Sequence, residues 1–182
     1  MDYKEMLVSG ADQLGIDLTE NQVKQFVDYL NLLQKWNQRI NLTAVEVEEE
    51  IVVKHFLDSL SLLAEIELTG SEKIIDIGTG AGFPGLPLKI VYPELDLTLL
   101  EAVKKKVTFL RQTVYKLDLD PVEVIHGRAE DYGRQEEYRA KYDYGLARAV
   151  AELNILSEYS LPFVGMEGRF VAYKGKEVMQ EI

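Results

Sequence analysis

The chain has no cysteine among its 182 residues. Disulfide bonds, thiolate zinc sites and a cysteine nucleophile are therefore excluded, and the composition favours a cytoplasmic location. The missing thiol also excludes the thiolate-addition route to methylation of a pyrimidine carbon. No uninterrupted apolar run reaches the roughly 18 residues that a transmembrane helix needs. The N-terminus lacks the basic and apolar regions of a signal peptide.

Positive charge is scarce as well. The 20 Lys and Arg residues face 31 Asp and Glu residues, and the net charge of −11 argues against general binding to nucleic acid. Residues 1–70 hold five basic and thirteen acidic residues, whereas residues 71–182 hold fifteen and eighteen. One predicted helix concentrates cations, namely Lys104, Lys105, Lys106, Arg111 and Lys116. Such a run is either a solvated helix face or a contact surface for RNA.

The hydrophobic pattern divides the chain near residue 70. Upstream, apolar side chains recur at steps of three and four from Val23 to Ile40, which predicts an amphipathic helix. Thr19 and Gln22 predict a capping box at its start, and a second helix is expected over about 48–64. We therefore predict an N-terminal helical cap over 1–70 and an α/β domain over 71–182, a size that one core can support.

Downstream of residue 70, strand-like and helix-like patterns alternate, which indicates a parallel sheet with crossover helices. Strands are expected near 73–78, 95–101, 122–126, 142–147 and 168–173, and helices near 85–92, 103–118, 151–161 and 175–182. Ligands of such sheets bind beyond the carboxyl ends of the strands, where the strand order reverses. Residues that directly follow a strand are therefore the candidates for a site.

A glycine-rich turn follows the first expected strand. Residues 76–85 read D-I-G-T-G-A-G-F-P-G, and glycines such as Gly78 and Gly80 allow a backbone to approach a nucleoside cofactor closely. A dinucleotide fingerprint requires a small residue where Phe83 stands. The spacing therefore favours S-adenosylmethionine, which has no pyrophosphate, over the nicotinamide cofactor or nucleotide sugar of an oxidoreductase.

An acid closes the second expected strand. Glu101 lies 21 residues after Gly80, close to the separation of about 20 at which a carboxylate accepts the ribose hydroxyls. The alternative is an exposed Glu at a strand end.

Several segments together resemble one known family. They are W-N-Q-R-I-N-L-T at 36–43, K-H-F-L-D-S-L at 54–60, the glycine turn, G-R-A-E at 127–130 and A-R-A-V at 147–150. From about Asn21 to Lys174 the chain closely resembles the bacterial 16S ribosomal RNA guanine-N7 methyltransferases, the glucose-inhibited division protein B family. The first two segments are more specific than the glycine turn, which many methyltransferases share.

The resemblance implies a Rossmann-like methyltransferase fold that binds S-adenosylmethionine. By similarity, the cofactor site would comprise Gly78, Gly80, Phe83, Glu101, Ala129, Glu130 and Arg148, with Arg148 facing the substrate. The RNA side would comprise Asn41, His55, Arg148 and Lys174. Two of these have plainer alternatives, because Asn41 could cap a helix end and His55 could be a hydrogen-bonded packing residue.

The resemblance also implies partners. Members of the family continue past the last residue of this chain, with two further strands and a basic tail, so we expect a truncated form that binds cofactor and methylates RNA weakly. The expected partners are 16S ribosomal RNA and the small ribosomal subunit, with no membrane, no metal and a monomeric state.

The chemistry of guanine N7 suits this composition. This atom carries a lone pair and no proton, so it can attack a sulfonium methyl group without a general base, and catalysis depends on positioning. Enzymes that methylate exocyclic amines usually carry a [D/N]-P-P-[Y/F] segment after the fourth strand, where this chain reads Leu146-Ala147-Arg148-Ala149. A module that binds the cofactor without catalysis remains the alternative.

Overall fold

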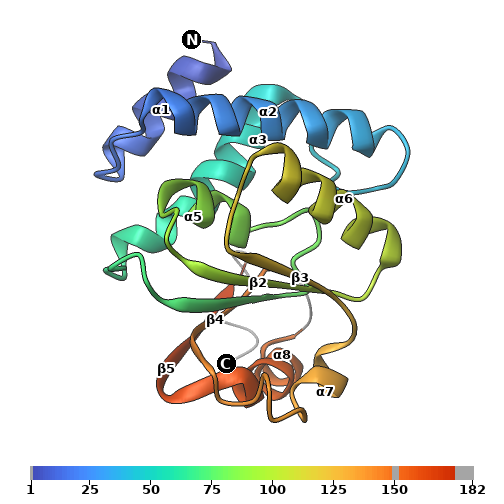
Figure 1. The fold of residues 1–182 in the computed structure, drawn as a ribbon. Helices are drawn as coiled ribbons and strands as arrows, with labels where there is room; N and C mark the ends of the chain where they lie inside the picture. Colours follow the sequence, from blue (N-terminus) through green and yellow to red (C-terminus); the bar gives the residue numbers. More distant parts are fainter. Residues whose placement is uncertain (1, 149–151, 175–182) are drawn as a thin grey trace.

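The computed structural model describes residues 2–148 and 152–174, which form a five-stranded parallel sheet between helical layers (Figure 1). Its strands are β1 (Lys73–Ile77), β2 (Asp96–Glu101), β3 (Val122–His126), β4 (Tyr142–Arg148) and β5 (Val164–Tyr173). They stand in the order β3-β2-β1-β4-β5. The order reverses between β1 and β4, so the carboxyl ends of these two strands mark the expected ligand edge. The predicted α/β fold is confirmed, although β5 begins four residues earlier than expected.

Helices cover both faces of the sheet. On one face α5 (Gly85–Val91) packs against β1 and β2, and α6 (Lys104–Lys116) packs against β2 and β3. On the other face lie α7 (Ala129–Tyr132), which was not predicted, α8 (Leu153–Ser160) and the 3-10 turn η3 (Leu161–Phe163) (Figure 1). The helix expected over 175–182 lies outside the described residues.

Helix α2 (Glu20–Asn37) forms an outer layer across α5 and α6 (Figure 1). Its Gln22 amide donates to the carbonyl oxygens of Ile90 and Val91, each at 3.0 Å, and its Gln25 amide donates to Leu117 at 2.8 Å. These carbonyls lie at the C-terminal ends of α5 and α6, where a helix leaves its last oxygens without partners. The outer helix thus caps the two helices beneath it.

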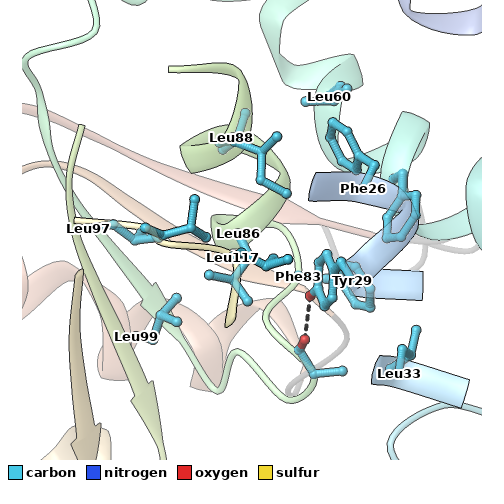
Figure 2. Close-up of a cluster of buried hydrophobic side chains, with 14 of the residues drawn as sticks. Phe26, Tyr29, Leu33, Leu60, Phe83, Leu86, Leu88, Leu97, Leu99 and Leu117 are labelled. Atoms are coloured by element: carbon cyan, nitrogen blue, oxygen red, sulfur yellow. Dashed lines mark hydrogen bonds between the residues drawn. The ribbon is translucent and has the colours of Figure 1, made fainter. Parts of the chain in front are cut away.

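The buried side chains of the N-terminal part share one hydrophobic cluster with the face of the sheet that α5 and α6 cover, whereas the opposite face belongs to a second cluster. Phe26, Tyr29 and Leu33 of α2 face Leu86 and Leu97 in the same interior (Figure 2). The hydrophobic interior is therefore continuous across residue 70, and the division into an N-terminal cap and an α/β domain stays a prediction.

Two N-terminal elements differ from the prediction. Helix α1 (Tyr3–Gln13) was not predicted, although Asp2 and Glu5 form a capping box at its start. The helix expected over 48–64 consists of α3 (Glu48–Ile51), a π-helical turn η1 (Val52–Leu57), α4 (Asp58–Leu60) and a 3-10 turn η2 (Ser61–Ala64). Single π turns within helices are rare and are frequent at functional sites. This one carries His55.

Candidate functional site

The glycine turn leaves β1 at the edge where the strand order reverses. Gly78 and Gly80 have φ angles of 65° and 63°, in the left-handed region that favours glycine. A Cβ built on Gly80 would have no neighbour closer than the Gly78 carbonyl oxygen, at 3.9 Å. The space beside this part of the turn is therefore open to a ligand. At Gly82, by contrast, a Cβ would lie 2.7 Å from the Tyr29 hydroxyl, so packing requires the third glycine.

Asp76 links the glycine turn to the start of α5. Its Oδ2 accepts hydrogen bonds from the Thr79 hydroxyl at 2.7 Å and from the Gly85 amide at 2.8 Å. The side chain is fully buried, and its Oδ1 has no partner in the described part of the chain. Burial is the main cause that raises the pKa of Asp76 to about 6.

Tyr29 of α2 contacts the glycine turn from the side of the outer helical layer. Its hydroxyl donates to the Ala81 carbonyl oxygen at 2.5 Å, and its ring stacks on Phe83 with the centroids 5.3 Å apart (Figure 2). Sequence reasoning missed this residue. The signal that could have found it is its place three residues after Phe26 on the apolar stripe.

Glu101 at the end of β2 lies against the same turn. Its Oε2 accepts from the Gly80 amide at 2.9 Å, and its Oε1 accepts from the Val103 amide at 2.7 Å. Each carboxylate oxygen has two lone pairs, so each retains one for a further donor such as a ribose hydroxyl. These residues fit S-adenosylmethionine, the cofactor that the spacing of the glycine turn favours. Ribose binding by Glu101 remains a prediction.

Arg148 ends β4 and is held by the helical segment 48–64. Its Nη1 donates to Asp58 Oδ2 at 3.0 Å and to the Lys54 carbonyl oxygen at 3.3 Å. Its guanidinium carbon lies 4.9 Å from the centroid of the Phe83 ring, within the range of a cation–π contact. The side chain is only 15% exposed. We refer to Arg148, His55, Asp58 and Phe83 as the Arg148 cluster, which unites three predicted site residues.

His55 connects Arg148 to the loop after α2. Its Nδ1 lies 3.2 Å from Arg148 Nη2 and 3.0 Å from the Lys54 carbonyl oxygen, and its Nε2 lies 2.7 Å from Thr43 Oγ1. The two Nδ1 contacts exclude each other, because the Lys54 carbonyl oxygen can only accept and the Arg148 guanidinium can only donate. In the tautomer that accepts from Arg148, the ring proton is on Nε2 and is donated to Thr43. Burial, assisted by the Arg148 charge, lowers the pKa of His55 to about 4. The ring is therefore neutral at neutral pH.

Asn37 fixes the loop over 38–47. Its Oδ1 accepts from the amides of Leu42 and Thr43 at 2.9 and 3.0 Å, and its Nδ2 donates to the Thr43 carbonyl oxygen at 2.9 Å. Sequence reasoning singled out neither Asn37 nor Thr43, although both lie in the W-N-Q-R-I-N-L-T segment. Asn41 is exposed on this loop and does not join the Arg148 cluster.

The other predicted residues lie at the same edge of the sheet. Ala129 and Glu130 open α7 and are half-buried, next to the Gly127 amide that donates to the Glu101 carbonyl oxygen. Lys174 directly follows β5. No helix among the described residues is long and apolar enough to cross a membrane. Residues 2–148 and 152–174 contain no group of three His, Cys, Asp or Glu side chains placed to hold a metal ion.

Comparison with known proteins agrees with this geometry. A protein of Caldanaerobacter subterraneus subsp. tengcongensis is 57% identical over 174 residues, which is 96% of this chain and 73% of that protein. One of Alkaliphilus oremlandii is 47% identical over 182 residues, the whole chain and 76% of that protein. Both are named ribosomal RNA small subunit methyltransferase G.

Solved structures show the same fold at low identity. An S-adenosylmethionine-dependent methyltransferase of Aquifex aeolicus has a TM-score of 0.53 at 19% identity, covering 73% of this chain and 74% of that one. A putative S-adenosylmethionine-dependent methyltransferase of Methanococcus maripaludis has a TM-score of 0.59 at 11% identity, covering 80% and 62%. The family model for rRNA small subunit methyltransferase G matches residues 22–182. The chain belongs to the rRNA small subunit methyltransferase G family, also called GidB.

Proposed function

We propose that this protein transfers a methyl group from S-adenosylmethionine to N7 of a guanine in the 16S ribosomal RNA of the small subunit. The observation that carries the proposal is the family match over residues 22–182, which includes every residue of the candidate site. The relatives named for this family are 47% to 57% identical to the chain over the aligned residues. No comparison supports the alternative of a non-catalytic binding module.

The cofactor is S-adenosylmethionine, which supplies an electrophilic methyl group on a sulfonium sulfur when it is bound. Gly78 and Gly80 would present the open backbone of the turn to it. Glu101 would accept the ribose hydroxyls with the lone pairs that its two backbone contacts leave free. Ala129 and Glu130, which open α7 beside Glu101, would flank the adenine.

The nearby titratable groups support a reaction without a general base. His55 has its two ring nitrogens engaged with Arg148 and Thr43, and Asp76 is buried beneath the turn. Guanine N7 needs no proton removed before it attacks, so these groups can serve positioning alone. The Arg148 guanidinium is already paired with Asp58. We therefore assign it the orientation of the substrate and not the stabilisation of charge.

The substrate side would include Arg148, His55, the exposed Asn41 and Lys174 at the end of β5. Small ribosomal subunits assemble in the cytoplasm, so we propose that the protein acts there. We also propose that it acts as a monomer.

A transfer assay tests the proposal. Small subunits that lack the modification, and naked 16S RNA, are incubated with the protein and S-adenosylmethionine labelled in the methyl group. The RNA is then digested to nucleosides. We expect label in 7-methylguanosine and none with a Gly78→Val variant. Label in a different nucleoside would refute the N7 assignment, and no label in either substrate would refute RNA methylation by this chain.

A further inference from the structure

The outward face of α6 carries positive charge in a chain of net charge −11. Its sequence KKKVTFLRQTVYK has five cations and no acid. Four of these cations are exposed, and none forms an ion pair in the described part of the chain, namely Lys104, Lys105, Arg111 and Lys116. These charges are therefore available to a partner.

The stability of the helix does not explain this arrangement. Lys104, Lys105 and Lys106 occupy the first turn, where the positive end of the helix dipole disfavours cations. The N-cap residue is Val103, which provides no side-chain cap. Mutual repulsion of the three lysines adds to the cost. Both effects would be relieved by an anionic partner.

One stripe of this face borders a groove. Lys104, Thr108, Arg111 and Tyr115 follow each other at helical steps of four, three and four, so they lie on one narrow side of α6. Tyr115 is 82% exposed. A groove of about 600 Å³ runs between α6 and the edge strand β3, lined by Arg111, Tyr115, Val122 and Val124. Arg111 Nη2 donates to the Val124 carbonyl oxygen at 3.2 Å, which holds the guanidinium at the groove.

We infer that the groove between α6 and β3 binds single-stranded RNA next to the target nucleotide, an inference that rests on the proposed function. Lys104 and Arg111 contact phosphates, and an unpaired base stacks on Tyr115. A row of cations with an exposed aromatic ring is the arrangement by which proteins hold single strands. Helix α6 begins shortly after Glu101, so its stripe leads away from the candidate cofactor site.

The acids of the groove limit the path of the strand. Asp118 and Asp120 line the end that lies beyond Tyr115, and their carboxylates repel phosphate. The phosphates therefore follow the stripe from Lys104 to Arg111, and the contact ends with a base at Tyr115.

Binding of a short, unstructured, fluorescein-labelled single-stranded RNA to the full chain tests the inference by anisotropy across a series of salt concentrations. For the variant Lys104→Gln/Arg111→Gln we expect the affinity for RNA to fall at least about tenfold. We also expect the slope of log K against log salt concentration to become smaller in magnitude by about 1.4, which is 0.7 for each lost phosphate contact. For Tyr115→Leu we expect a loss of at least about fivefold with an unchanged slope, because stacking is not ionic. The matched control is Lys24→Gln/Lys35→Gln on α2, which likewise removes two exposed positive charges.

Equal binding by wild type and both α6 variants would overturn the inference, and so would the absence of binding by wild type. Competition by polyglutamate or duplex RNA as strong as that by single-stranded RNA would also overturn it, because any polyanion would then suffice. Methyl transfer to small subunits is measured on the same samples. If the α6 variants transfer methyl groups with an unchanged KM, RNA binding by the groove is refuted and the proposed function stands. If wild type binds RNA through the groove but transfers no methyl group, the proposed function alone is refuted.

Discussion

The Arg148 guanidinium lies over the ring of Phe83, with its central carbon 4.9 Å from the ring centroid. The His55 ring stacks on the same phenylalanine at 4.8 Å. Phe83 is the residue whose size is incompatible with a dinucleotide fingerprint. One side chain therefore both distinguishes the cofactor turn and supports the arginine that faces the proposed substrate. Phe83 is only 5% exposed, and its contact with the cofactor remains a prediction.

The first prediction concerns Arg148→Lys. A lysine is a compact point charge that cannot contact Asp58 and His55 in the geometry of the guanidinium fork. We expect the rate of methyl transfer to fall by more than about tenfold, with a smaller change in the Kd for S-adenosylmethionine. Single-turnover kinetics and calorimetry measure the two effects. Asp58→Asn serves as the control, because it weakens the ion pair and leaves the contacts of the guanidinium with Phe83 and His55. A lysine variant with the wild-type rate would remove Arg148 from the substrate side.

The second prediction concerns Tyr29→Phe, which retains the stacked ring and removes the donor to the Ala81 carbonyl oxygen. A buried acceptor left without its partner costs about 1–3 kcal/mol, and the turn would also be held less firmly. We expect the free energy of unfolding to fall by that amount and the cofactor affinity to fall several-fold. Tyr142→Phe is matched, since its hydroxyl donates to Thr98 inside the protein and not to the turn. It should lose stability and retain cofactor affinity. Equal affinity losses in both variants would contradict a specific role for Tyr29.

The third prediction concerns Glu101→Gln. The carboxylate accepts from two backbone amides at once, whereas a glutamine has a single acceptor oxygen and would direct its NH₂ group at one of these donors. We expect the Kd for S-adenosylmethionine to rise at least about tenfold. A 2′,3′-dideoxy analogue should lose much less affinity if the carboxylate also accepts the ribose hydroxyls. Parallel losses for both ligands would confine Glu101 to shaping the turn.

The sequence was sufficient to predict most of the fold. Alternating apolar runs and glycine turns located all five strands, because local patterns determine which segments are buried in a parallel sheet. The π turn over Val52–Leu57 was not predictable, because an extra residue within a helical pattern leaves no local signal. Helix α1 was missed even though its capping box could be read from Asp2 and Glu5.

The candidate site was less predictable where it depends on distant contacts. Gly80 and Glu101 were singled out because each lies at the carboxyl end of a strand. Arg148 was placed correctly at the end of β4, but its ion pair with Asp58 joins residues 90 positions apart. The support that Tyr29 gives to Ala81 spans 52 positions. No local pattern encodes such pairs, since they arise from the packing of α2 and of the segment 48–64 on the sheet.

The fourth prediction uses the buried carboxyl of Asp76. Its pKa is raised from an ordinary value of 3.8 to about 6, so between these values the native state binds more protons than the unfolded state. Stability therefore falls as the pH rises through this window and is constant above it. Across the whole window, the contribution of Asp76 to the free energy of unfolding falls by about 3 kcal/mol. Asp76→Asn removes the titration, and we expect the stability difference between wild type and variant to decrease from pH 4 to pH 6.5 in chemical denaturation. A difference independent of pH would show that Asp76 is ionised throughout.

The fifth prediction concerns His55, for which the sign is opposite. Its pKa is lowered from 6.5 to about 4, so between these values the unfolded state binds more protons than the native state. The stabilising contribution is complete above about pH 6.5 and is lost as the pH falls towards 4. We expect this contribution to the free energy of unfolding to be about 1–2 kcal/mol. It is smaller than the energy that corresponds to the full pKa shift, because the ring is partly exposed to solvent.

His55→Gln removes this titration and can still bond to Thr43 and Arg148 through its amide. Relative to this variant, wild type should gain stability from pH 4 to pH 6.5, in the same window in which it loses stability relative to Asp76→Asn. The two slopes have opposite signs and partly offset each other in the wild-type protein, so the pair of variants is needed to separate them. If His55→Gln shows no such slope, or if its cofactor affinity falls more than its methyl-transfer rate, His55 is not the neutral link between Arg148 and the loop after α2.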